Sequence, residues 1–128
     1  MGNGTPLGRV RGLGASHHGT DHWLQQRLTA VGNVLLVTWF VVSLLRLPLG
    51  DHGAVIRWAS NPAVAFALML LVISVFWHLR LGLQVLIEDY VHGAARLLAL
   101  VALNFYAIGG AAYGLFSIAR IAFAGGAA

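Results

Sequence analysis

The sequence predicts an all-α integral membrane protein with three transmembrane helices. Hydrophobic residues make up 59% of its 128 residues and charged residues only 9%, whereas an average soluble domain has roughly 25% charged residues. The chain also contains three apolar segments, each long enough to cross a bilayer, which takes about 20 helical residues. Polar segments with Gly or Pro separate them. We expect one transmembrane domain over residues 22–123.

The charge pattern favours a lipid bilayer as the partner and argues against nucleic acid. The net charge of +4 comes entirely from arginine, because the chain has no lysine. These arginines are few and flank the apolar segments, as expected for residues that orient a protein in a membrane. The chain has no cysteine. Disulfides, thiolate metal sites and Cys-held iron–sulfur clusters are therefore excluded in this chain.

The first element is a polar arm rich in Gly, His and Arg over residues 1–21, which we expect to be flexible or docked on a partner. Asp21 is a plausible N-cap for an amphipathic start that leads into the first span, at about residues 29–47. Pro48 and Gly50 then interrupt the apolar run.

The connection over residues 46–62 is expected to be a loop that carries Trp58 as an anchor in the membrane interface. Pro62 suits the first turn of a helix, because its missing N–H would have no partner there. The second span then covers about residues 63–87.

Gly93 marks a turn before the third span, at about residues 96–123, and residues 124–128 form an unstructured tail. The third span contains a run of small residues that would allow close helix packing. They are Gly109, Gly110, Ala111, Ala112 and Gly114.

The arginines near the span ends predict the orientation. Those on the side of the N-terminus and the second connection are Arg9, Arg11, Arg27, Arg80 and Arg96, and those on the other side are Arg46, Arg57 and Arg120. The larger group is expected on the cytoplasmic side, which places the N-terminus in the cytoplasm. We expect Arg80 to snorkel toward that surface.

His78 lies deep in the second span, where a polar side chain is costly and suggests a function. With about 100° per residue, Gly82, Val85 and Asp89 share its helix face, and the eleven residues from His78 to Asp89 rise about 16 Å. Gly82 leaves room beside the imidazole for a flat group. A buried imidazole can ligate haem iron. The alternative is a histidine hydrogen-bonded across a helix interface.

The other histidines fall in arms, loops or span ends: His17, His18, His22, His52 and His92. A second axial haem ligand would therefore come from another chain. Asp89 and Tyr90 could serve a quinone, with a phenol that donates to its carbonyl and a carboxylate that relays protons. They could equally be a solvated helix end with an interfacial tyrosine. Arg27 is either an orienting charge or a partner for a haem propionate.

Two further functions compete with a haem-binding role. A small multi-pass transporter or proton channel could use His78 and Asp89 as a relay. A purely structural anchor would use neither.

The segment "HLRLGLQVLIEDYVH", residues 78–92, resembles the hydrophobic membrane anchor subunits of succinate dehydrogenase, complex II. In that family a haem-ligating histidine is followed by glycine four residues later and by Asp-Tyr eleven and twelve residues later. His78, Gly82, Asp89 and Tyr90 match this pattern. "HWLQQRLTAV", residues 22–31, is similar to the start of the family's first span, and the resemblance covers nearly the whole chain.

This resemblance implies a subunit of a heteromeric helical bundle in a respiratory complex of the tricarboxylic acid cycle. His78 would be an axial ligand of haem b, packed near Gly82, with Arg27 at a propionate. Tyr90 would hydrogen-bond ubiquinone, with Asp89 beside the quinone pocket.

The same resemblance implies three protein partners. A cytochrome b556-type membrane subunit would supply the second haem ligand, and a flavoprotein and an iron–sulfur subunit would dock on the cytoplasmic or matrix face. This chain has no flavin-binding fingerprint, so we expect succinate oxidation elsewhere in the complex. Since no transit peptide is visible, we expect the bacterial inner membrane rather than mitochondria.

Overall fold

The computed structural model describes residues 6 and 19–124. The predicted flexible arm, apart from Pro6 and its last three residues, therefore lies outside the described residues. So does the predicted tail, except for Ala124.

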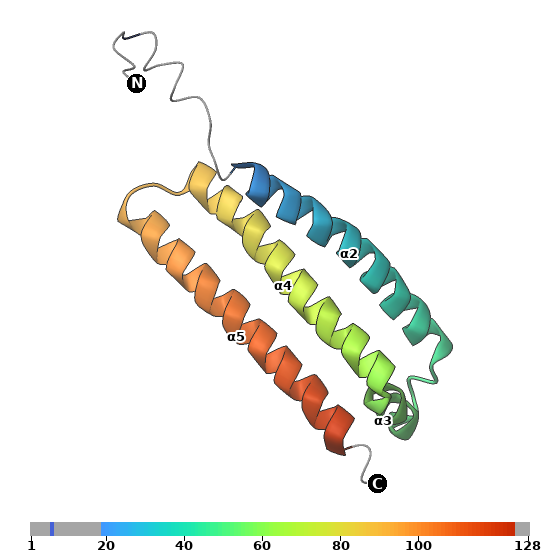
Figure 1. Ribbon diagram of the computed structural model, residues 1–128. Coiled ribbons are helices and arrows are strands. Elements are labelled where there is room, and N and C mark those ends of the chain that lie inside the picture. Colours follow the sequence, from blue (N-terminus) through green and yellow to red (C-terminus); the bar gives the residue numbers. More distant parts are fainter. Residues whose placement is uncertain (1–5, 7–18, 125–128) are drawn as a thin grey trace, which may run out of the picture.

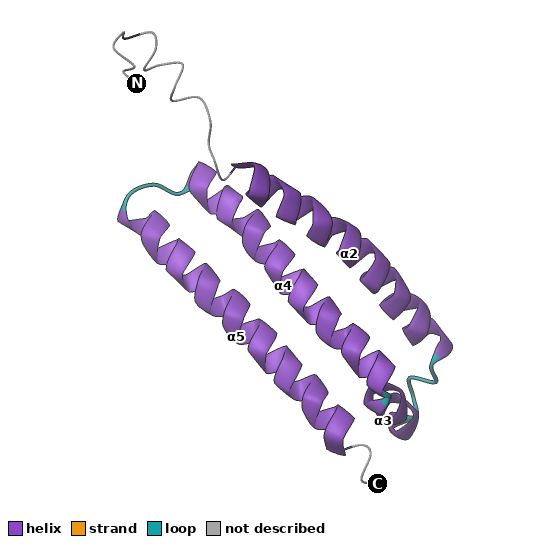
Figure 2. Cartoon of the chain, in the orientation of Figure 1, coloured by secondary structure: helices purple, strands orange, loops and turns teal. Residues whose placement is uncertain are grey.

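Residues 19–124 form four α-helices and no strand. Figure 2 colours the helices purple. Three of these helices are long and apolar enough to cross a membrane. The helices are α2 (Gly19–Arg46), α3 (His52–Ser60), α4 (Pro62–Tyr90) and α5 (Ala94–Ala124). The prediction of an all-α protein with three membrane-spanning helices is confirmed.

Helix α2 begins about ten residues before the predicted first span. Asp21 lies in its first turn rather than at its N-cap. An acidic residue there is favourable, because the N-terminus of a helix carries partial positive charge. The amphipathic start and the apolar span therefore form one continuous helix.

The prediction of a loop over residues 46–62 was wrong, because α3 occupies most of it. Trp58 of this helix stacks on Trp39 of α2, with ring centroids 6.1 Å apart, and lies 6.4 Å from the ring of Phe40. Ala59 is buried. The connection becomes helical because this face packs on the neighbouring helices, a contact that composition alone does not reveal.

Residues that favour the beginning or the end of a helix lie at both ends of α4. Asn61 is its N-cap, and its side-chain oxygen accepts hydrogen bonds from the backbone N–H groups of Ala63 (3.0 Å) and Val64 (3.4 Å). Pro62 occupies the first turn, as predicted. After the helix ends, Gly93 has φ +66°, a conformation that glycine adopts without steric cost. This confirms Gly93 as a turn residue.

The three long helices form a layer with α4 in the middle (Figure 1). Within the described residues, α2 and α5 each pack on α4 but not on each other, and α3 packs against α4 and α5 at one end. Very few side chains are buried: Ala59, Ala65, Leu81, Leu103 and Ala107. Most of the apolar surface of α2 and α5 thus faces outward, toward lipid or other proteins.

Two glycines of the predicted small-residue face bring α5 close to α4. A Cβ added to Gly110 would lie 2.7 Å from Phe76 Cζ, and one added to Gly114 would lie 3.0 Å from Val72 Cγ1. A Cβ on Gly109 would meet nothing within 4 Å. The close contact therefore belongs to Gly110 and Gly114, one turn apart, and Gly109 is outside it.

Candidate functional site

The imidazole of His78 is half-buried and faces α2. Its Nδ1 lies 3.0 Å from the hydroxyl oxygen of Thr29, on the neighbouring helix. Within the described residues, this is the one hydrogen bond of the His78 side chain. The second ring nitrogen, Nε2, has no hydrogen-bond partner in the part of the chain that the structure describes.

The Thr29 oxygen has two further neighbours in its own helix. It lies 2.8 Å from the carbonyl oxygen of Gln25 and 3.1 Å from that of Gln26. Both carbonyls can only accept, so the hydroxyl is the donor in these contacts. The Thr29 oxygen therefore lies between one imidazole nitrogen and two carbonyl oxygens.

Thr29 was not recognised from the sequence, where it only marked the start of a span. A signal was present, because His22, Gln26, Thr29 and Asn33 recur at spacings of four, three and four residues. That spacing places polar groups on one face of a helix. An apolar span with a polar stripe predicts a helix interface or a ligand on that side.

Three other polar atoms on this stripe are buried without a hydrogen-bond partner in the described part of the chain. They are His22 Nε2, Gln26 Oε1 and Asn33 Oδ1. An unpaired buried polar group costs about 1–3 kcal/mol. Several polar atoms of this stripe therefore lack hydrogen-bond partners among the residues that the structure describes.

Gly82 lies where Gln26 approaches α4. A Cβ at this position would lie 3.5 Å from Gln26 Nε2, an ordinary contact distance. Gly32 and Ser74 make a similar approach, with a Cβ on Gly32 lying 3.5 Å from Ser74 Oγ. The predicted packing of haem against Gly82 stays a prediction.

Asp89 and Tyr90 form the end of α4 and are exposed; Tyr90 as a residue is 78% accessible. Because both belong to the same helix as His78, about 16 Å of helix rise separates Asp89 from the imidazole. The structure thus places the acid–phenol pair at a helix end and does not bring it into contact with His78.

Glu88 forms an ion pair between α4 and α5 that its sequence pattern did not predict. Its carboxylate accepts a hydrogen bond from Gln84 Nε2 at 3.1 Å and lies 3.8 Å from a guanidinium nitrogen of Arg96. The two adjacent acidic residues therefore have different surroundings. Glu88 connects the two helices, and its neighbour Asp89 is exposed.

Arg27 is exposed, with its guanidinium carbon 5.0 Å from the centroid of the Trp23 ring. It precedes Thr29 by two residues, which turns it about 200° around α2. The structure therefore does not bring Arg27 next to His78. Its predicted role at a haem propionate stays a prediction.

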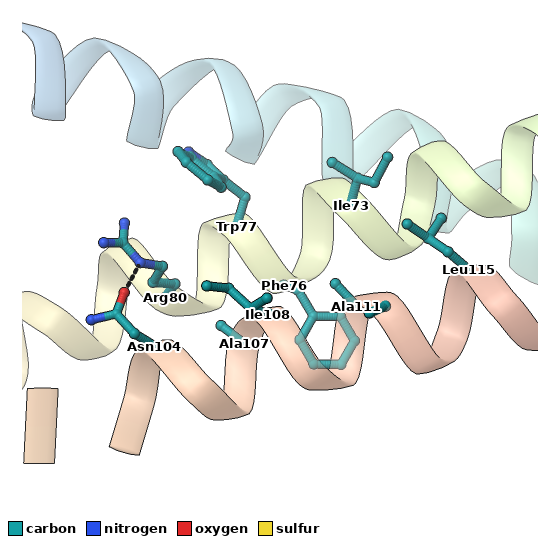
Figure 3. A pocket seen from close by; sticks show the side chains of 10 residues that line it. Ile73, Phe76, Trp77, Arg80, Asn104, Ala107, Ile108, Ala111 and Leu115 are labelled. Atoms are coloured by element: carbon teal, nitrogen blue, oxygen red, sulfur yellow. Dashed lines mark hydrogen bonds between the residues drawn. The ribbon is translucent and has the colours of Figure 1, made fainter. Parts of the chain in front are cut away.

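Arg80 was predicted to snorkel toward the membrane surface, but its side chain is held by a residue of α5. Its Nε donates a 2.6 Å hydrogen bond to the side-chain oxygen of Asn104 on α5, and its guanidinium carbon lies 5.5 Å from the Trp77 ring centroid. Asn104 in turn donates to the carbonyl of Leu100 at 2.8 Å. Figure 3 shows this pair at one end of an otherwise apolar cavity of about 510 Å³ between α4 and α5.

Within the described residues, no group of three or more His, Cys, Asp or Glu side chains could hold a metal ion. Among the described histidines, only His78 lies in the central part of a span. Among the described side chains, His78 is therefore the one histidine that a metal at this depth could use.

Comparison with known proteins gives a consistent family. The family model described as "Succinate dehydrogenase/Fumarate reductase transmembrane subunit" matches residues 1–111. A succinate dehydrogenase hydrophobic membrane anchor subunit of Rickettsia bellii is 34% identical over 83 residues, which cover 65% of this chain and 66% of the relative.

The equally named protein of Rickettsia conorii is 30% identical over 84 residues, covering 65% of this chain and 67% of the relative. That of Paracoccus denitrificans is 28% identical over 97 residues, covering 76% of this chain and 75% of the relative. The chain thus matches about two thirds of the length of the two Rickettsia proteins. No solved structure shows a significant match. With three membrane-spanning helices and a family match over most of its length, this chain belongs to the succinate dehydrogenase/fumarate reductase transmembrane subunits.

Proposed function

We propose that this chain is the hydrophobic membrane anchor subunit of a succinate dehydrogenase. In this proposal His78 is one axial ligand of a haem b shared with a partner chain, and Asp89 and Tyr90 contribute to the site where ubiquinone is reduced. The single observation that carries the proposal is an imidazole inside a span whose Nδ1 lies against Thr29 and whose Nε2 has no partner among the described residues.

The side chains around His78 fit a shared haem. A histidine ligand usually donates the N–H of one ring nitrogen to a partner and binds the metal with the other, and the half-buried His78 has one nitrogen placed for each task. The buried polar atoms of His22, Gln26 and Asn33 lie on the same face of α2 as Thr29, so the imidazole faces a polar stripe of that helix. When bound, haem b supplies a one-electron redox centre.

The second axial ligand would come from a cytochrome b556-type membrane subunit. The open layer of α2, α4 and α5 supports such a partner, because it leaves most of the apolar surface uncovered. The chain has no cysteine, so the iron–sulfur clusters belong to a separate subunit. Succinate oxidation belongs to a flavoprotein subunit.

The end of α4 suits quinone chemistry at the membrane boundary. The phenol of Tyr90 can donate a hydrogen bond to a quinone carbonyl, and Asp89 can pass protons from water toward it. Both side chains are exposed and therefore available to a substrate and to partner subunits.

The arginine distribution supports a cytoplasmic N-terminus. The start of α2, the end of α4 and the start of α5 lie at one end of the layer (Figure 1). In this orientation Asp89 and Tyr90 face the cytoplasm, where the flavoprotein and iron–sulfur subunits would dock. Since the relatives are bacterial, we place the complex in the bacterial inner membrane.

A proton relay from His78 to Asp89 is the weaker alternative. The α4 face between them carries Gly82 and Val85, neither of which can transfer a proton. A relay would need water along about 16 Å of helix.

The test is His78→Ala in the full complex purified from membranes, with His52→Ala as the matched control, because His52 is exposed at the start of α3. We expect His78→Ala to abolish the low-spin b-type absorption and paramagnetic resonance signals while the partner subunits still co-purify. His52→Ala should leave them intact. An unchanged low-spin haem in His78→Ala would overturn the proposal.

A further inference from the structure

We infer that Thr29 is a positioning residue for His78: its hydroxyl oxygen accepts a hydrogen bond from Nδ1–H and so reserves Nε2 for iron. This inference rests on the proposed role of His78 as a haem ligand. It adds a residue on α2 that decides which ring nitrogen faces the metal.

The proton of the Thr29 hydroxyl decides the direction of the hydrogen bond. The Thr29 oxygen lies 2.8 Å from the carbonyl oxygen of Gln25. Two oxygens this close repel each other unless a proton lies between them, and the carbonyl has none to give. The hydroxyl proton therefore points along its own helix, toward the carbonyl of Gln25 or of Gln26.

Because the hydroxyl proton points toward a carbonyl of α2, the Thr29 oxygen can only accept a hydrogen bond from the imidazole, 3.0 Å away. His78 Nδ1 must then carry a hydrogen. In a neutral imidazole the proton on Nδ1 leaves a lone pair on Nε2. The tautomer required for ligation through Nε2 is thus selected inside this chain.

The same contact fixes the plane of the ring. The hydroxyl is itself held by the backbone of α2, so the acceptor is in place before a cofactor binds. His78 belongs to α4, and the bond therefore also fixes the distance between the two helices at the depth of the imidazole. Partners of this kind usually change metal affinity by 10–100-fold when removed.

The bond also has an electronic consequence, which a purely structural contact lacks. An Nδ1–H that donates to oxygen makes the imidazole a stronger ligand. A stronger ligand favours the more highly charged ferric ion over the ferrous ion, which lowers the reduction potential. Removal of the hydroxyl should therefore raise the potential of the haem.

The experiment compares Thr29→Val, which keeps the shape and removes the acceptor, with Thr29→Ser, which keeps the acceptor. Thr38→Val is the matched control, because Thr38 is exposed and nine residues along α2, about half a turn away in direction. Each variant is purified as the whole complex. Haem content, the low-spin paramagnetic resonance spectrum and the reduction potential from a redox titration are measured.

We expect Thr29→Val to raise the potential by up to about 59 mV, the equivalent of a tenfold change in the ferric-to-ferrous affinity ratio. Haem should also be lost more readily on dilution into detergent. Thr29→Ser should behave like the unmodified complex, and Thr38→Val should show neither change.

An unaltered potential and haem affinity in Thr29→Val would overturn the inference about Thr29. The proposed function fails separately, if His78→Ala keeps its low-spin haem. Should Thr29→Val not assemble, Thr29→Cys serves instead, because a thiol is a much weaker acceptor than a hydroxyl. A potential in Thr29→Cys equal to that in Thr29→Ser would also overturn the inference.

Discussion

The contact between α4 and α5 allows a sharp test with two neighbouring glycines. A methyl group at Gly110 would lie 2.7 Å from Phe76 Cζ, whereas one at Gly109 would meet nothing within 4 Å. Gly110→Ala and Gly109→Ala are the same chemical change in the same helix, one residue apart. The difference between them isolates the packing of Gly110 against Phe76.

The expected magnitude follows from this geometry. Carbon atoms prefer separations of about 3.5–4.0 Å, so Gly110→Ala must move Phe76 or the two helices by roughly 1 Å. Overpacking of this kind costs about 1–3 kcal/mol. Both variants gain up to about 1 kcal/mol from the better helix propensity of alanine, and this gain cancels in the comparison. We expect Gly110→Ala to have the lower free energy of unfolding, by about 1–3 kcal/mol.

The assay is reversible unfolding in mixed micelles with a rising fraction of sodium dodecyl sulfate, followed by circular dichroism. The effect should shrink when Phe76→Ala is added to Gly110→Ala, because the clashing ring is then gone. Equal stabilities of the two single variants, within about 0.5 kcal/mol, would refute the close approach of α5 to α4 at this position. In lipid such contacts matter, because helices there associate through packing rather than through a hydrophobic driving force.

Two other substitutions test the end and the start of α4. Tyr90→Phe removes the proposed donor to the quinone and should slow quinone reduction at least tenfold, while dye-linked succinate oxidation continues; the exposed Tyr113→Phe is the control, and unchanged quinone kinetics would exclude the phenol from the site. Asn61→Ala removes the N-cap acceptor and should lower the free energy of unfolding by about 1 kcal/mol. Asn61→Asp keeps an acceptor and should not, so equal losses in both variants would contradict the capping role.

The three spans and the order of groups along α4 follow from the amino-acid sequence alone. Long apolar segments in lipid must satisfy their own backbone hydrogen bonds, and a helix does so within one segment. The glycine turn at Gly93 and the proline at Pro62 were predicted for the same local reason, since their backbone preferences need no distant partner. The rise from His78 to Asp89 was also fixed, because both residues belong to one helix.

Which side chains meet between helices becomes visible only once the helices are packed against one another. The pairing of Thr29 with His78 and that of Arg80 with Asn104 depend on how each helix is rotated and shifted against its neighbour. The sequence places each residue on a face, but that rotation is set by many small packing contacts, such as the one at Gly110. Contacts of this kind are individually weak and distant in sequence, and they therefore act only when the helices are packed together.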